Sequence, residues 1–326
     1  MTITRRALTG SLGWAALAAL QPAAWAQSAY PNKPIHVINP YAPGGVVDIL
    51  TRPVINRLGA ALGVPMVLEA KPGGGGTIGT DFVAGAPADG YKWLIATTSN
   101  AANMALMPNI RSDLLKDFAP VAQFAYTPNY FVVPASLPVS TLQEYVALAK
   151  KNPGGLNYGS GGIGSTPFLG FELFKHVAGI DVVAVHYKGS PPQIPDLLSG
   201  QLSAAYLSAA LTLAQAKGGR LKVLAVADDK RSKDFPDVPT LAEAGYGKAA
   251  VSPWFAVLVP AATSKAIRDR IEAEIRKTMT APDIVTALEA QGAVPDFRGS
   301  TELRKKIENE ITTWRVLVRA TGLKAE

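Results

Sequence analysis

One segment of the chain has the composition of an anion-binding turn: Pro40-Tyr41-Ala42-Pro43-Gly44-Gly45-Val46-Val47-Asp48. It follows an apolar, strand-like run at 35–38 and precedes residues 48–58, where apolar residues recur at helical spacing. The two glycines let backbone N–H groups approach a ligand closely. A helix start adds unpaired donors and the positive end of the helix dipole. The alternative is a tight strand-to-helix connection that binds nothing.

A second glycine-rich turn, residues 158–167, also comes directly before a predicted helix. Ser165 or Thr166 can cap this helix with Pro167 in its first turn, which leaves N–H groups and hydroxyls free for an anion. The turn satisfies the G-x-G-x-x-G dinucleotide pattern, but residues 74–79 satisfy it too. An exported protein has no ready nicotinamide pool, so a dinucleotide enzyme is disfavoured.

Two further segments have chemically useful residues. The glycine-rich run at 71–80 is better explained by backbone geometry and close packing than by ligand contact. At 186–191 a predicted strand passes into a helix, where Lys188 offers a positive charge and Ser190 a helix cap. A surface lysine beside an ordinary cap is the alternative for that segment.

No catalytic or metal site can be assembled from the sequence. The chain has no cysteine, and its histidines, His36, His176 and His186, lack the spacing of metal ligands. Neither a G-x-S-x-G elbow nor a phosphate-binding G-x-x-x-x-G-K-[ST] loop is present. Asp228 and Asp229 precede two basic residues, which is typical of a solvated loop. We therefore predict no metal, no cofactor and no enzymatic activity.

The N-terminus predicts export to the periplasm. Arg5 and Arg6 precede an apolar stretch at 7–20, and Ala24-Trp25-Ala26 supplies a small-x-small cleavage site, so residues 1–26 are predicted to be a signal peptide. The arginine pair resembles a twin-arginine signal, but Thr9 makes that match imperfect, and general secretory export stays open as well. No later run reaches the roughly 18 apolar residues of a membrane span.

Charge and composition narrow the class of protein further. The net charge of +7 falls to +5 when the two signal arginines are removed, and Lys and Arg are spread singly. No basic stripe with interleaved aromatic residues appears, so nucleic-acid binding is not predicted. Without cysteine, stability must come from packed cores. Removal of 26 residues from 326 leaves 300, enough for two lobes of ordinary size.

Strand-like and helix-like segments alternate along the chain, which predicts an α/β architecture with mostly parallel sheets. Further predicted strands cover 66–68, 93–96, 130–133, 181–185 and 222–226, and further predicted helices cover 141–151, 167–178, 190–199, 263–280 and 301–321.

A set of short motifs resembles, in order, the substrate-binding receptors of tripartite tricarboxylate transporters, the Bug-type periplasmic solute-binding proteins. The motifs run through nearly the whole mature chain. They are YPNKPI at 30–35, APGG at 42–45 with Asp48, KPG at 71–73, TIG at 77–79, ADGY at 88–91, YGSG at 158–161 with Gly164 and Ser165, YKG at 187–189, DLLSGQ at 196–201, DVPTLAEAG at 237–245 and WF at 254–255.

The resemblance implies a two-lobed periplasmic-binding-protein fold, of Venus-flytrap, type II-like form, that closes its central cleft on a small carboxylate. Lobe 1 would comprise residues 27–124 plus 254–326 and lobe 2 residues 125–253, with crossing segments near 122–130 and 252–259. The implied partners are a small-molecule carboxylate and the integral-membrane permease subunits of the transporter. The receptor itself is expected to be a monomer.

In this family the Pro-Gly-Gly turn and the Gly/Ser-rich turn face the carboxylate, so the resemblance implies walls at 41–48 and 159–168, flanked by 187–190. The predicted ligand-binding residues are Tyr41, Ala42, Pro43, Gly44, Gly45, Asp48, Asn100, Ser160, Gly161, Gly164, Ser165, Thr166, Phe168, Tyr187, Lys188, Ser190 and Ser208. A carboxylate facing a carboxylate would repel, so Asp48 is expected to cap its helix or hold an ordered water.

The chain departs from the family pattern at several positions: Phe168 stands where histidine is frequent, His186 replaces a proline, Ala70 an asparagine and Asn39 an apolar residue. If Phe168 lines the cleft, an apolar ring replaces a polar contact. The ligand preference would then move from small hydroxylated dicarboxylates toward aromatic or longer apolar carboxylates, with Tyr41 reinforcing that shift. If Phe168 packs within its helix, the shift has no basis.

Two other functions remain open on the same scaffold, because a fold does not fix a function. One is an exported enzyme, such as a lyase or hydrolase, which would turn over the bound carboxylate. The other is a sensory receptor that presents its ligand to a membrane kinase instead of a permease.

Overall fold

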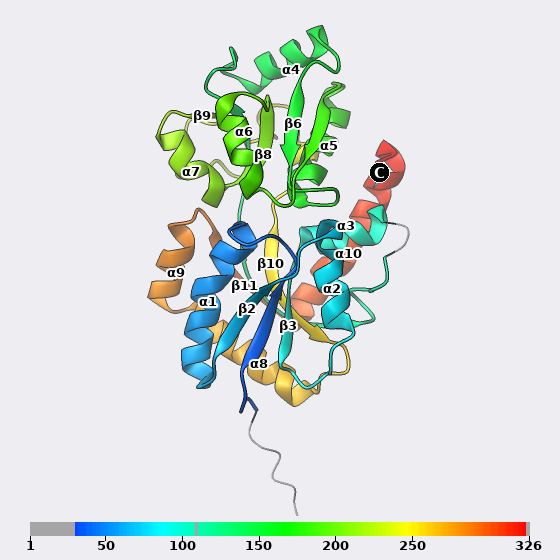
Figure 1. The fold of residues 1–326 in the computed structure, drawn as a ribbon, viewed down its shortest axis with the longest axis vertical. Helices are drawn as coiled ribbons and strands as arrows, with labels where there is room; N and C mark the ends of the chain where they lie inside the picture. The colour runs from blue at the N-terminus through cyan, green and yellow to red at the C-terminus, as the bar shows by residue number, and fades with distance from the viewer. Residues whose placement is uncertain (1–29, 108–109, 324–326) are drawn as a thin grey trace, which may run out of the picture.

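The structure, a computed structural model, describes residues 30–107 and 110–323. The predicted signal peptide therefore lies outside the described residues. The chain forms two lobes stacked along the long axis of the molecule, each built on one sheet covered by helices (Figure 1). This confirms the predicted α/β class and the two-lobed architecture. No described helix has the length and apolar character needed to cross a membrane.

Lobe 1 contains a six-stranded sheet in the order β11-β4-β10-β3-β1-β2. Its strands are β1 (Ile35–Asn39), β2 (Met66–Ala70), β3 (Lys92–Thr97), β4 (Phe118–Tyr126), β10 (Trp254–Pro260) and β11 (Val294–Gly299). Its helices are α1 (Val46–Leu62), α2 (Thr77–Ala84), α3 (Thr98–Leu106), α8 (Lys265–Met279), α9 (Pro282–Glu289) and α10 (Ser300–Thr321), with a 3-10 turn at Gly74–Gly76.

Lobe 2 contains a five-stranded sheet in the order β7-β6-β8-β5-β9. Its strands are β5 (Asn129–Pro134), β6 (Asn157–Ser160), β7 (Val183–His186), β8 (Ala204–Ser208) and β9 (Leu221–Ala227). Its helices are α4 (Leu142–Lys151), α5 (Thr166–Ala178), α6 (Ile194–Ser199) and α7 (Ala209–Lys217), with 3-10 turns at Pro191–Gln193 and Gly247–Ala249.

Both sheets are mixed, so the prediction of mostly parallel sheets is wrong. In lobe 1, β1 is parallel to β2 and β3, whereas β10 is antiparallel to β3 and β4. In lobe 2, β5 is antiparallel to β8 and β9. The physical reason is the passage between lobes: β4 carries the chain out of lobe 1 and β10 brings it back beside β4, which forces opposite directions.

The two passages between the lobes lie side by side. The first runs from Tyr126 to Asn129 and the second ends at Trp254. The Thr127 N–H donates to the Pro253 carbonyl at 3.0 Å, and the Asn129 amide donates to the Val251 carbonyl at 3.0 Å. The two connections are thus tied together by hydrogen bonds at the junction of the lobes.

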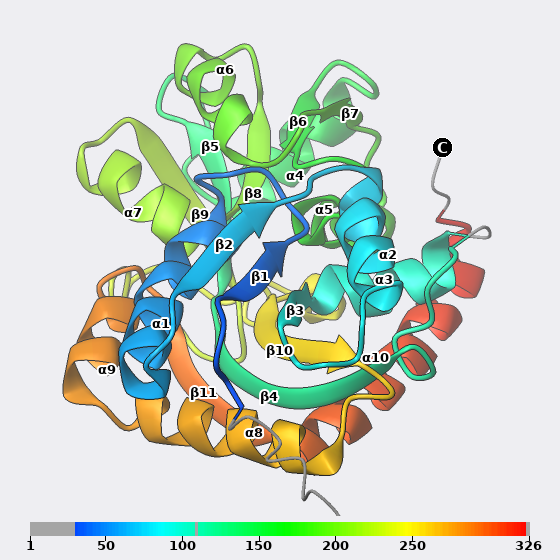
Figure 2. The same ribbon diagram turned by 60° about the horizontal axis from the view of Figure 1, so that its bottom comes forward.

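Alternation along β10 explains how the lobe 1 sheet is covered on both faces. Phe255 and Val257 pack in the cluster beneath α1 and α8, whereas Trp254 and Ala256 pack in the cluster beneath α2, α3 and α10. Successive strand residues point to opposite faces, so a continuously apolar strand serves two cores. Figure 2 shows α1, α8 and α9 on one side of this sheet and α2, α3 and α10 on the other.

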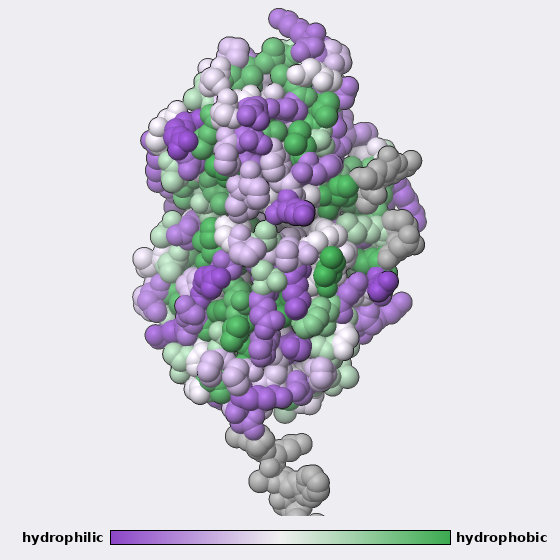
Figure 3. Space-filling view, in the orientation of Figure 1, coloured by the Kyte–Doolittle hydropathy of each residue, from purple (hydrophilic) through white to green (hydrophobic). Residues whose placement is uncertain are grey.

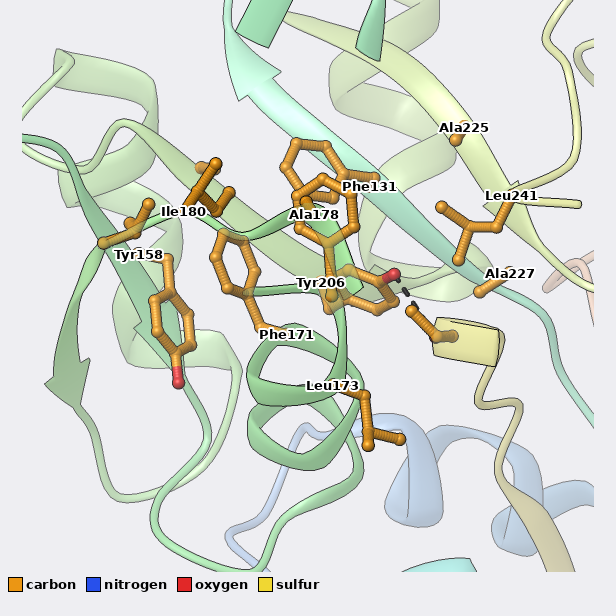
Figure 4. Packing of buried hydrophobic residues seen from close by; sticks show 14 of the residues in the cluster. Phe131, Tyr158, Phe171, Leu173, Ala178, Ile180, Tyr206, Ala225, Ala227 and Leu241 are labelled. Carbon is orange, nitrogen blue, oxygen red and sulfur yellow. Dashed lines mark hydrogen bonds between the residues drawn. The ribbon is translucent and has the colours of Figure 1, made fainter. Parts of the chain in front are cut away.

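An aromatic cluster fixes helix α5 against the lobe 2 sheet (Figure 4). The ring of Phe131 on β5 lies 5.3 Å from Phe171 and 4.9 Å from Phe174 of α5, and 5.6 Å from Tyr206 on β8. Phe171 also stacks on Tyr158 of β6 at 3.8 Å. These contacts set the direction of α5, whose N-terminus faces lobe 1.

Helix α10 packs against both lobes. Leu303, Ile307 and Ile311 belong to the lobe 1 core, whereas Trp314, about one turn after Ile311, belongs to the lobe 2 core and is 3 % exposed. In Figure 1 the red helix α10 accordingly runs from the lower lobe up beside the upper one. The C-terminal helix is therefore a third physical link between the lobes.

Removal of the Trp314 side chain should destabilise the protein strongly. We expect Trp314→Ala to lower the free energy of unfolding by about 3–5 kcal/mol, since it leaves a cavity in a packed core. Val316→Ala, on the same helix at 62 % exposure, should change it by no more than about 0.5 kcal/mol. Urea denaturation of the mature chain measures both values. Equal effects of the two variants would refute the bridging role of Trp314.

Candidate functional site

Four helix N-termini meet at one cavity between the lobes. Its volume is about 60 Å³. Its lining includes the N-cap residues Gly45 of α1 and Thr97 of α3 from lobe 1, and Ser165 of α5 and Ser208 of α7 from lobe 2. Each helix start carries backbone N–H groups without intrahelical partners and a positive partial charge. The cavity, called the inner cavity below, therefore favours a negatively charged occupant.

The inner cavity is lined by neutral residues. Among its described lining residues there is no lysine, arginine, histidine, aspartate or glutamate. Its polar side chains are hydroxyls and one amide, including those of Ser99, Asn129 and Thr166. An anion placed here would be met by directional neutral donors instead of a countercharge.

The first glycine turn is closed by its own side chains. The Tyr41 N–H donates to Asn39 Oδ1 at 2.9 Å, and the Gly44 N–H donates to Asp48 Oδ2 at 3.2 Å. Gly44 has a φ of +73°, in the left-handed region that favours glycine. Asp48 also pairs with Arg52 at 3.0 Å and lines neither cavity described here. Its carboxylate holds the start of α1 through these contacts.

The Tyr41 side chain joins this turn to the start of α3. Its hydroxyl lies 3.0 Å from Thr97 Oγ1, and its ring occupies the space beside Gly76, where a Cβ would come within 3.1 Å of the ring. Burial raises the pKa of the Tyr41 hydroxyl above its ordinary value, so the group stays neutral. Tyr41 thus contributes a wall and a neutral hydroxyl to the cavity.

A capping box sets the start of α3. The Thr97 N–H donates to Asn100 Oδ1 at 2.8 Å, and the Ser99 N–H donates to Thr97 Oγ1 at 3.2 Å. The Asn100 amide donates in turn to Thr80 Oγ1 at 2.8 Å. Asn100 lines neither cavity, so in this structure it positions Thr97 and Ser99 and does not face a ligand site.

The second glycine turn is held in a similar way. Ser160 Oγ lies 2.8 Å from His186 Nδ1 and accepts the Gly162 N–H at 3.3 Å. Ser165 Oγ accepts the Phe168 N–H at 3.4 Å, as expected for the cap of α5. Thr166 follows it and lines the inner cavity.

The lobes touch across the cleft, so the structure shows the closed form. Ser99 Oγ of α3 lies 2.8 Å from Thr166 Oγ1 of α5. Gly164 of lobe 2, with a φ of +76°, approaches Asn103 of lobe 1 so closely that a Cβ would lie 2.3 Å from Asn103 Oδ1. At Gly189 a Cβ would lie 2.9 Å from the Ala42 side chain. These glycines permit the close approach of the two walls.

A larger cavity of about 1050 Å³, called the outer cavity below, adjoins the inner one and shares Tyr41, Ala42, Gly161 and Gly189 with it. The glycine run at 73–76 forms one wall. All four of these glycines have positive φ, which supports the role predicted for the run in backbone geometry.

The positively charged lining residues of the outer cavity include Arg111 and Lys188. In the orientation of Figure 1, most residues at the centre of the boundary between the lobes are hydrophilic or of intermediate hydropathy (Figure 3).

The predicted ligand-binding residues fall into three groups. Lining the inner cavity are Tyr41, Ala42, Gly45, Gly161, Ser165, Thr166, Ser190 and Ser208. Lining only the outer cavity are Tyr187 and Lys188. Lining neither are Pro43, Gly44, Asp48, Asn100, Ser160, Gly164 and Phe168.

Phe168 packs in the lobe 2 core and is 5 % exposed. Its ring lies 5.7 Å from that of His186. Because it lines neither cavity, the geometry gives no support to the predicted preference for aromatic or longer apolar carboxylates. The physical reason is helical periodicity: Phe168, the third residue of α5, lies on the face of the first turn that packs into the lobe 2 core.

Sequence reasoning missed several residues of the inner cavity, including Thr97, Ser99 and Asn129. Thr97 and Asn100 carry the T-x-x-N spacing of a cap after an apolar strand, which was an available signal. Asn129 gives no local signal, because it reaches the cavity only through the pairing of β5 with β8.

The chain matches the family described as "Tripartite tricarboxylate transporter family receptor" over residues 50–323. It is similar to Protein BugT of Bordetella pertussis, with 36 % identity over 90 % of this chain and 91 % of the relative. Among solved structures it is similar to an R. palustris protein with adipate, with 30 % identity, a TM-score of 0.86 and coverage of 90 % and 98 % of the two chains. It is also similar to MatC from Rhodopseudomonas palustris with bound malate, with 26 % identity, a TM-score of 0.85 and coverage of 89 % and 100 %.

Closure should depend on the absence of a side chain at Gly164. We expect Gly164→Ala to hold the lobes apart, since its Cβ would lie 2.3 Å from Asn103 Oδ1, and the buried Asn103 side chain is held in place by its hydrogen bond to the Gly75 carbonyl. Gly179→Ala is the matched control, because Gly179 also has a positive φ, +61°, but has no atom within 4 Å of the added carbon. Small-angle X-ray scattering should give a larger radius of gyration for Gly164→Ala than for the control. Identical radii would contradict this assignment.

Asp48 should contribute to stability and not to ligand affinity. We expect Asp48→Asn to lower the free energy of unfolding by about 0.3–1 kcal/mol, because it removes a negative charge from the first turn of α1 and an ion pair with Arg52. Denaturation and ligand titration of the same variant measure the two quantities. A large loss of affinity at unchanged stability would contradict the capping role.

Proposed function

This chain belongs to the tripartite tricarboxylate transporter receptor family, and from that premise we propose that it captures a small carboxylate between its lobes. It then delivers the carboxylate to the membrane permease subunits of a tripartite transporter, without catalysis. The family predicted from the ordered motifs is confirmed. The observation that carries the proposal is the convergence of four helix N-termini on a cavity with a neutral lining.

The inner cavity offers what a carboxylate needs when it leaves water. A carboxylate only accepts hydrogen bonds, and the cavity presents helix N–H groups and hydroxyls from both lobes. Hydrogen bonds to a charged group are worth about 1.5–3 kcal/mol each. Since the donors come from both lobes, a bound carboxylate stabilises the closed form over the open one.

The ligands of the similar structures agree with this class. One relative was solved with adipate and another with malate, both small carboxylates. A ligand longer than the inner cavity would extend into the outer cavity, where Lys188 and Arg111 supply positive charge. Lys188 therefore belongs to the proposed site as a contact for the distal end of longer ligands.

The remaining parts of the proposal concern location and assembly. The protein is exported to the periplasm by its signal peptide, through the general secretory or the twin-arginine route, and acts there as a monomer. Its lobes, residues 27–124 plus 254–326 and residues 125–253, close as units about the paired crossing segments.

A thermal-shift panel on the mature chain tests the proposed function. A carboxylate at about a hundred times its dissociation constant adds about 2.7 kcal/mol to the stability and should raise the melting temperature by several degrees. The diamide of the same dicarboxylate should not raise the melting temperature, because each of its NH₂ groups is a donor and would meet the N–H and hydroxyl donors of the inner cavity. If no aliphatic or aromatic carboxylate shifts the melting temperature at millimolar concentration, the proposal is wrong. Chemical change of the bound ligand, followed by NMR, would favour the exported enzyme instead.

A further inference from the structure

We infer that Asn103 sets the ligand affinity of this receptor without contacting the ligand, because closure of the lobes buries its Oδ1 atom without a hydrogen-bond donor. The inference rests on the proposed function and adds a residue that governs capture from outside the inner cavity. Closure is less favourable than it would be without this atom, and a bound carboxylate must offset the difference.

Asn103 lies in helix α3 of lobe 1, about one turn after Ser99, and its side chain is buried. It lines neither the inner nor the outer cavity. Its Nδ2 donates to the Gly75 carbonyl at 2.9 Å. Because a carbonyl only accepts, this hydrogen bond fixes the orientation of the amide and leaves Oδ1 for the other neighbours. Asn103 thus presents an acceptor to them.

The neighbour of Asn103 Oδ1 across the cleft is the second glycine turn of lobe 2. The backbone of Gly164 approaches so closely that an added Cβ would lie 2.3 Å from Oδ1. The methyl group of Met107 lies 2.9 Å from the same added carbon, so it closes this contact from the lobe 1 side. Within the described part of the chain, Asn103 Oδ1 is buried without a hydrogen-bond partner. The closed form therefore leaves this acceptor unpaired.

A second oxygen meets carbon in the same contact. The Ile163 carbonyl of lobe 2 approaches Gly75 of lobe 1, where an added Cβ would lie 2.4 Å from the carbonyl oxygen. Among the described residues, no backbone hydrogen bond joins Gly75 to Ile163. By contrast, Ser99 Oγ lies 2.8 Å from Thr166 Oγ1 across the same cleft. Helix α3 therefore favours closure at Ser99 and opposes it at Asn103.

The cost at Asn103 falls on the closed form alone. When lobe 2 moves away, Gly164 uncovers Oδ1 and water can donate to it. When the lobes close, that water is lost and no protein donor replaces it. The apparent dissociation constant equals the intrinsic one divided by the fraction of receptor in the binding-competent form. A lower closed fraction therefore weakens the binding of every ligand that the closed cleft holds.

Removal of the acceptor should tighten binding. We expect Asn103→Ala to lower the dissociation constants of malate and adipate at least about threefold, as measured by isothermal titration of the mature chain. The Gly75 carbonyl loses its donor in this variant, but Gly75 lines the outer cavity, where water can hydrate it. Asn309→Ala, the same change at an exposed position of lobe 1, should leave both constants unchanged.

Two further measurements keep the test decisive. Asn103→Ser should shift the affinity in the same direction and replaces Asn103→Ala if that variant does not fold, because a serine hydroxyl can bond to the carbonyl one turn back in its own helix. Small-angle X-ray scattering without ligand measures closure itself. The radius of gyration should be smaller for the Asn103 variants than for the wild type and for Asn309→Ala.

The outcomes separate this inference from the proposed function. Tighter binding together with a smaller ligand-free radius would support the inference. Weaker binding by both Asn103 variants would overturn it, because Asn103 would then hold the lobes together, and unchanged affinities and radii in folded variants would overturn it as well. Failure of malate, adipate and every other carboxylate to bind the wild type would overturn the proposed function itself. The ligand-free radii would then still decide whether Asn103 opposes closure.

Discussion

A carboxylate that enters a closed cleft loses its hydration shell, and a cavity lined by neutral residues must replace that shell with directional donors. Helix N-termini are the densest source of such donors in a protein. Here the N-caps Gly45, Thr97, Ser165 and Ser208 line one cavity, two from each lobe. The packing within each lobe and the contacts between the lobes hold these four helix N-termini at one small cavity.

Each lobe meets that need with rigid packing. The aromatic cluster around Phe131 fixes α5, and the capping box of Thr97 and Asn100 fixes α3. Glycines occur where the two walls approach most closely, as at Gly164. Helix α10 packs on both lobes, so opening of the cleft must either break the contact of Trp314 with lobe 2 or turn about it. Closure and ligand capture thus both depend on the packing of α5, α3 and α10 and on the close approach of the walls at Gly164.

Local features of the chain were predictable from the sequence, whereas features set by pairing between distant segments were not. The two glycine turns, their helices and the family were recognisable because each has a local signature. The antiparallel strands β4 and β10 were missed because their direction depends on the passage between lobes. Asn129 was missed because only the β5–β8 register brings it to the cavity. The sequence left open whether Phe168 faces the cleft or the core, because the orientation of α5 is a tertiary property.

A crystal structure of the mature protein with a bound small carboxylate tests the central claim most directly. The account predicts the carboxylate in the inner cavity, within about 2.7–3.1 Å of backbone N–H and hydroxyl donors from both lobes. It also predicts no lysine or arginine nitrogen within about 4 Å of that carboxylate. A carboxylate held instead by Lys188 or Arg111 in the outer cavity, with the inner cavity filled by water, would contradict the account.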